Sequence, residues 1–167
     1  MRSGRVEPEL HALRKSAEDL AIRSRERTSS AHLLAAVAAS DTPASDLLVE
    51  RRLSTEEIVR LGRSVSDDVA EPVRAALQRA HDIAVRMGFA QASAAHLLLA
   101  LLNEPRSAAR RVLDQAAVDV GRLRTAAMQV GLGLVRRSRA PGRPGAAAGA
   151  PRWPNRPTAS GRPGALR

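Results

Sequence analysis

Two histidines at matching places in the sequence are the first candidates for chemistry. His32 and His96 lie 64 residues apart, and each stands just before an apolar run. A histidine titrates near neutral pH, so it can transfer protons in catalysis or, when neutral, bind a metal ion. Neither has a second histidine at i, i+4 or the carboxylate companions that a metal site needs. We interpret both as structural residues, which donate a hydrogen bond to a backbone carbonyl or pack their rings.

Adjacent acids are the other candidates, because two well-separated carboxylates can act as general acid and base. The pairs are Glu56 with Glu57 and Asp67 with Asp68. On a helix, sequence neighbours point about 100° apart, so we interpret both pairs as solvated charges or helix caps. The stretch GLGLVRR lacks the Gly-Lys-Ser/Thr ending of a phosphate loop, and the chain has no cysteine. The sequence therefore predicts no enzyme, no bound metal and no cofactor.

An internal repeat surrounds the two histidines. The segment SSAHLLAAVAAS at 29–40 returns as AAHLLLALLNEP at 94–105. Upstream, SAEDLAIRS at 16–24 returns as RAHDIAVRM at 79–87. Self-similarity at a fixed period indicates a repeated structural unit. Downstream the apolar positions repeat as well, with Leu48, Leu53 and Ile58 answering Leu113, Val118 and Leu123.

Each copy predicts four helices. Apolar residues at three-and-four spacing mark a first helix after Pro8 and after Pro72. The second helix is short and apolar and begins near Ser30 or Ser93, whose hydroxyl can cap it. The third helix is expected at about 44–51 and 106–116.

The fourth helix has signals at both ends. Ser54 and Asp119 are cap-forming residues that precede it in the two copies. It is expected to end near Gly62 and Gly131, where a left-handed residue can close a helix.

These elements predict an all-α fold of two tandem four-helix repeats related by a pseudo-twofold axis. The domain should span residues 5–131, with repeat 1 at about 7–63 and repeat 2 at about 70–131. The two repeats should dock through their apolar second helices, Leu33 to Ala39 and Leu97 to Leu102. Because two equivalent halves already pair within one chain, we expect a monomer.

The net charge of +10 is concentrated at the end of the chain. Residues 136–167 hold eight arginines and no acid, whereas the other 135 residues carry 19 basic and 17 acidic groups. This Arg-, Pro-, Gly- and Ala-rich tail should be disordered. It can bind nucleic acid or an anionic surface through charge, although Trp153 is its only residue for stacking on bases. Otherwise it is a solvated extension.

The chain shows no signal for a membrane. No stretch approaches the roughly 18 apolar residues that span a bilayer, and the N-terminus lacks the apolar core of a secretory signal. We therefore expect a cytoplasmic protein.

The paired A-H-L-L motifs and the preceding A-x-D-L/I-A helices resemble the Clp repeat domain, the N-terminal domain of the Clp/Hsp100 unfoldases. The resemblance covers about residues 5–131. It implies a non-catalytic module that docks substrates and adaptors onto AAA+ ATPase rings. Partners implied for this chain are a Clp ATPase, an adaptor or an unfolded client protein.

Two departures from that family matter. The family's usual motif is T-E-H-L-L. In this chain Ala31 and Ala95 stand at the glutamate position, which removes a charge beside each histidine. No ATPase module follows the repeats, so we expect a free-standing Clp repeat protein that acts as an adaptor, an accessory subunit or a competitor of the ring's own domain.

The resemblance also implies a peptide-binding surface where the first helices of the two repeats begin. The aromatic residues of that surface are replaced by Val6 and Val69, its basic residue is Arg74, and its acidic residue is Gln78. We expect these four residues to edge a shallow apolar groove. The alternative is an ordinary solvated helix face.

Overall fold

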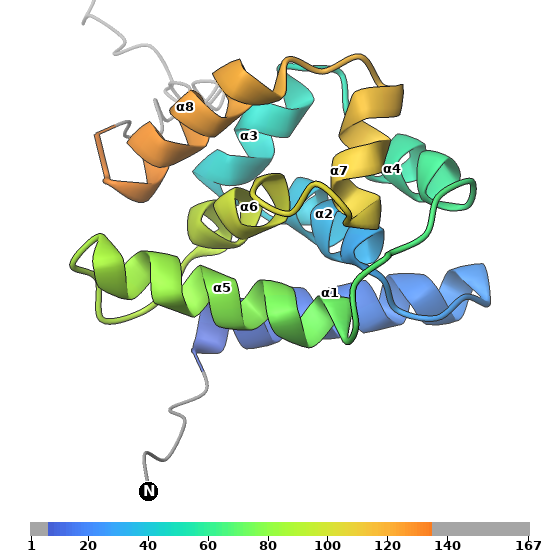
Figure 1. Ribbon diagram of the computed structural model, residues 1–167, viewed down its shortest axis with the longest axis horizontal. Coiled ribbons are helices and arrows are strands. Elements are labelled where there is room, and N and C mark those ends of the chain that lie inside the picture. Colours follow the sequence, from blue (N-terminus) through green and yellow to red (C-terminus); the bar gives the residue numbers. More distant parts are fainter. Residues whose placement is uncertain (1–6, 135–167) are drawn as a thin grey trace, which may run out of the picture. The chain divides into compact units, whose positions relative to one another are not determined.

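Helices make up all of the regular structure that the computed structural model describes, which is residues 7–134 (Figure 1). These residues lie in the first of the chain's two units, Met1–Arg137, and the second unit, Ser138–Arg167, lies outside them. The all-α prediction is confirmed. The helices are α1 (Pro8–Ser24), α2 (Ser30–Ala39), α3 (Pro43–Val49), α4 (Thr55–Gly62), α5 (Pro72–Arg86), α6 (Ala94–Leu102), α7 (Ala108–Gln115) and α8 (Val120–Gly131).

The helix starts follow local sequence signals. Proline occupies the first turn of α1, α3 and α5, where a missing N–H costs nothing. Ser54 caps α4 by accepting the backbone N–H of Glu57 over 3.2 Å, and Asp119 caps α8 by accepting that of Arg122 over 3.0 Å. Both caps are those that the sequence predicts.

The glycines at the ends of α4 and α8 are used differently from the prediction. Neither Gly62 nor Gly131 is left-handed, and the positive φ of 72° falls on Gly133 instead. A Cβ at Gly62 would lie 3.1 Å from the Cβ of Ala31. The missing side chain therefore allows close approach of α4 to α2, not a left-handed turn.

The two repeats pack through their third helices as well as their second. The second helices α2 and α6 contact each other, as the sequence predicts. In addition, α3 of the first repeat packs against α6 and α8 of the second, and α7 of the second packs against α2 and α4 of the first (Figure 1). Each repeat thus completes its helix packing with a helix from the other, which periodicity alone does not reveal.

The core is centred on α2 and α6. Every residue of α6 is buried, and so are all residues of α2 from Ser30 to Val37. A helix that is apolar on all sides belongs inside a protein. Leucines and alanines fill this centre, and burying each leucine contributes about 2 kcal/mol. Among the described residues, no helix is long and apolar enough to cross a membrane.

Candidate functional site

The two repeat histidines lie at the third position of α2 and of α6. The Ser29 N–H donates to His32 Nδ1 over 3.2 Å, and the Ser93 N–H donates to His96 Nδ1 over 3.0 Å. In return, each serine side chain accepts a backbone N–H at the third helical position, which completes a capping box. The rings accept from the backbone and do not donate to it, which differs from one of the two predicted roles. The other predicted role, ring packing, is seen at His96, whose ring centroid lies 5.3 Å from that of Phe89.

Both histidines are neutral near neutral pH. Burial lowers the pKa of His32, opposed by the nearby carboxylates of Glu26 and Asp67. Burial likewise lowers the pKa of His96, opposed by Glu7 and Glu9. Since each Nδ1 accepts a hydrogen bond, the proton of the neutral ring is assigned to Nε2.

This protonation pattern leaves neither histidine suited to act as a base. The lone pair that could take up a proton is on Nδ1, and it already accepts a hydrogen bond from the backbone N–H of a serine. Each Nε2 is buried without a hydrogen-bond partner. The carboxylate of Glu26 lies 3.4 Å from the Nε2 atom of His32. Within residues 7–134 there is also no group of three or more metal-ligating side chains.

Asp67 joins the two repeats at the start of two helices. Its carboxylate accepts the Ser30 N–H over 3.0 Å at the start of α2, and the Ala108 N–H over 2.7 Å at the start of α7. The Ser30 hydroxyl donates to the same carboxylate and accepts the Ala109 N–H over 2.9 Å. Ser29, not Ser30, is therefore the capping serine of α2. A negative charge here also suits the positive ends of both helix dipoles.

The second repeat receives a reciprocal carboxylate. The Glu9 side chain, in the first turn of α1, accepts the Ala94 N–H at the start of α6 over 2.9 Å. In each repeat, then, an acid from near the first helix of the other repeat satisfies the start of the second helix. For Asp67, helix capping is one of the two interpretations that the sequence offers, but its partners are not predictable because they lie 37 and 41 residues away. The sequence did not identify Glu9, whose partner lies 85 residues away.

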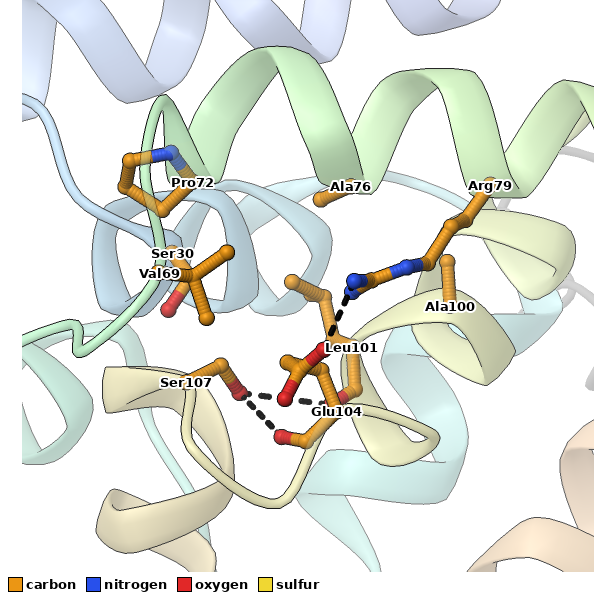
Figure 2. Close-up of a pocket in the computed structure, with 9 residues that line it drawn as sticks. All are labelled: Ser30, Val69, Pro72, Ala76, Arg79, Ala100, Leu101, Glu104 and Ser107. Carbon is orange, nitrogen blue, oxygen red and sulfur yellow. Dashed lines mark hydrogen bonds and ion pairs between the residues drawn. The ribbon is translucent and has the colours of Figure 1, made fainter.

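Val69 lies over a hollow between the repeats (Figure 2). The hollow is about 10 Å³, which is room for about one water. On one side Arg79 of α5 pairs with the Glu104 carboxylate over 2.6 Å, and Ser107 donates to the Glu104 carbonyl over 2.8 Å. This hollow is too small to receive a peptide side chain.

A wider cleft lies on the other side of Val69 and Pro72, which line both spaces. Its volume is about 540 Å³, and it runs past His32, the linker between the repeats and the end of α4. Carboxylates and guanidinium groups both line it, so it is mixed in charge and not a plain apolar groove. The charged side chains are those of Glu26, Arg27, Arg63 and Asp67.

The remaining residues of the expected binding surface lie on the exposed side of α5 or outside the described residues. Arg74 pairs with Glu71 over 3.3 Å, and Gln78 donates to Asp82 over 3.2 Å. Neither is among the residues that line the two spaces beside Val69. Val6 lies outside residues 7–134, as does the tail at 136–167. The shared groove of these four residues stays a prediction.

Together the repeats and their cross-capping acids define a pseudo-symmetric helical domain in which carboxylates and histidine Nδ1 atoms accept backbone N–H groups at helix starts. Comparison with known proteins is consistent with this class. Residues 69–147 match the family model of the Clp repeat (R) N-terminal domain. The fold is similar to that of the Hsp104 N-terminal domain from Candida albicans, with a TM-score of 0.58 and 18% identity over 74% of this chain and 89% of that one. A search of curated protein sequences found no match.

Residues 69–147 therefore match the Clp repeat (R) N-terminal domain in sequence. The family match falls on the second repeat and extends past the described residues. The likeness to the Hsp104 domain extends the same fold over both repeats.

Proposed function

We propose that the domain is a non-catalytic protein-binding module of the Clp repeat type, which docks substrates or adaptors or regulates a Clp unfoldase-protease. The observation that carries this proposal is the family match over residues 69–147. The fold supports it, because Asp67, Glu9 and the Nδ1 atoms of the two repeat histidines all accept backbone N–H groups at helix starts.

The docking surface proposed first is the one edged by Val6, Val69, Arg74 and Gln78. Supporting it, Arg74 and Gln78 are exposed one turn apart on α5, and Val69 borders the wide cleft beside the linker. An unfolded segment would place apolar side chains at the valines and a carboxylate on Arg74. We further propose that the protein acts in the cytoplasm as a monomer, which light scattering of the full chain would check.

Binding of two purified partners to the full chain tests the function. The probes are a carboxymethylated, permanently unfolded protein and a Clp ATPase ring. We expect at least one of them to bind, and the double variant Val69→Asp/Arg74→Glu to weaken the binding about tenfold. Arg122→Glu is the matched control, because its exposed guanidinium lies on α8. If neither probe binds, the docking function is wrong.

A second function rests on the charge distribution. Residues 7–134 hold 17 basic and 17 acidic side chains and are formally neutral, whereas residues 136–167 carry eight arginines. We propose as the alternative that the tail binds nucleic acid or an anionic surface and that the helical domain is its scaffold. DNA binding would then weaken with salt, with a log–log slope as steep as about −7 for eight phosphate contacts. Deleting residues 136–167 should abolish it, and salt-insensitive or absent binding would exclude this alternative.

A further inference from the structure

A second groove lies on the second repeat, between α5, α6 and α8. Its volume is about 190 Å³, and Ile83, Met87, Leu99 and Met128 form its apolar lining. Met87 and Met128 are the only methionines of the chain besides Met1. Methionine is flexible and polarisable, so it is favoured on surfaces that adapt to a partner. Both of the chain's internal methionines therefore line one groove.

The first repeat offers an internal comparison. The alignment that matches Leu20 with Ile83 also matches Arg23 with Arg86 and Ser24 with Met87. Leu20, Arg23 and Ser24 line a groove at the corresponding place between α1 and α4.

The two grooves differ in character. That of the first repeat is lined by serine and threonine and by the carboxylate of Glu56, and Arg63 there pairs with Glu26 over 3.3 Å. Met87 stands at the position of Ser24, and Met128 stands at that of Arg63 in the alignment that matches Ile58 with Leu123. The groove of the first repeat is thus the more polar of the two, although Leu20 and Val59 also line it.

The second-repeat groove also has a definite charge. Arg86 and Arg124 line it, no acidic side chain does, and neither arginine pairs with a carboxylate of residues 7–134. Arg124 makes only a long hydrogen bond of 3.5 Å to the Leu102 carbonyl. Two unpaired guanidinium groups beside an apolar surface favour a partner that carries both carboxylates and apolar side chains.

We propose that this groove binds an acidic peptide segment of a protein partner, which inserts an apolar side chain between Met87 and Met128 and places carboxylates on Arg86 and Arg124. The proposal rests on the docking function and assigns it a second surface. The groove is smaller than the 300–1,000 Å³ or so of small-molecule sites, which suits a side chain. The chain's own arginine-rich tail has the wrong charge to occupy it.

Methionine-methyl NMR of the full chain tests this directly. The probe is a synthetic peptide with leucine at i, i+3 and i+4 spacing and glutamate between, and its control replaces every glutamate by lysine. We expect the acidic peptide to shift the Met87 and Met128 methyl signals to saturation at physiological salt, and the basic peptide to leave them in place. Both methyl groups belong to side chains that line the groove, so their signals report on the groove directly.

Matched variants separate the two repeats. Arg86→Glu should weaken the affinity measured from the methyl shifts at least about tenfold, whereas Arg23→Glu at the equivalent place in the first repeat should leave it unchanged. Both side chains are exposed on their helices, and thermal unfolding checks that both variants fold. Equal losses in the two variants would overturn the proposal.

Other outcomes overturn it as well. The proposal is wrong if the methyl signals do not respond to the acidic peptide. It is also wrong if they shift with protein concentration alone, since a second copy of the chain would then occupy the groove. The docking function fails separately. If the unfolded protein or the ATPase ring binds Arg86→Glu as tightly as it binds the unmodified chain, only the groove proposal is wrong. If neither the acidic peptide nor the two protein probes bind the unmodified chain, the groove proposal and the docking function are both wrong.

Discussion

Replacing Asp67 with alanine removes the carboxylate that joins the starts of α2 and α7. Two backbone N–H groups, of Ser30 and Ala108, then lose their acceptors, and so does the Ser30 hydroxyl. Ser30 is 1% exposed and Ala108 is 0% exposed, so water does not readily replace the lost carboxylate. The substitution therefore leaves buried donors unsatisfied in both repeats at once.

The magnitude follows from the number of donors. An unsatisfied buried donor costs about 1–3 kcal/mol, and the loss of a helix cap costs about 0.5–2 kcal/mol. Partial relaxation of the linker offsets some of this cost, so we expect Asp67→Ala to lower the free energy of unfolding by about 3 kcal/mol. Asp67→Asn keeps one acceptor oxygen and should lose roughly half as much.

The neighbouring acid provides the control. Asp68 forms an exposed ion pair with Arg111, and exposed pairs contribute about 0–1 kcal/mol. Asp68→Ala should therefore be nearly neutral. Urea unfolding followed by far-UV circular dichroism measures all three variants, because the signal comes from the helices of residues 7–134 and the single tryptophan, Trp153, lies outside these residues. A loss for Asp67→Ala no larger than that for Asp68→Ala would refute the assigned role of Asp67.

Three further predictions concern stability. Because folding lowers the pKa of His32 and His96, the stability that they contribute is complete above pH 6.5 and declines as the pH falls below it, by up to about 1.4 kcal/mol per pH unit for each. Glutamine at both positions keeps the capping box without a proton equilibrium, so urea unfolding at several pH values should show a flatter dependence, and an unchanged slope would contradict the burial argument. Gly62→Ala places a Cβ 3.1 Å from a rigid side chain of α2 and should cost about 1 kcal/mol, seen as a lower Tm, whereas a raised Tm would show that helix propensity dominates there. Leu98→Ala, at 0% exposure, should cost about 2–5 kcal/mol in urea unfolding, and a loss under 1 kcal/mol would mean that α6 is not central.

Most of the fold is predictable because its signals are local. Ser54 and Asp119 cap the helices that directly follow them, and the prolines mark helix starts. The capping boxes of His32 and His96 also have a local signal, which is a serine three residues before each histidine. The sequence analysis predicted serine caps from it but did not predict that the histidines take part in them.

The rest depends on tertiary contacts. Asp67 and Glu9 reach helices far away in the chain, and no periodicity shows which amide an acid will meet. The packing of α3 and α7 against the other repeat cannot be predicted from the sequence for the same reason. For the candidate site, the sequence indicated Val69 at a cleft edge, but it could not show that Glu26, Arg63 and Asp67 give that cleft mixed charge.

The packing of the third helices across the two repeats has a consequence for the handling of this domain. Because α3 packs against α6 and α8, and α7 packs against α2 and α4, a single repeat has no complete core of its own. By the same geometry, a chain cut between α4 and α5 should yield two fragments that are unfolded apart and that reconstitute the domain when they are mixed.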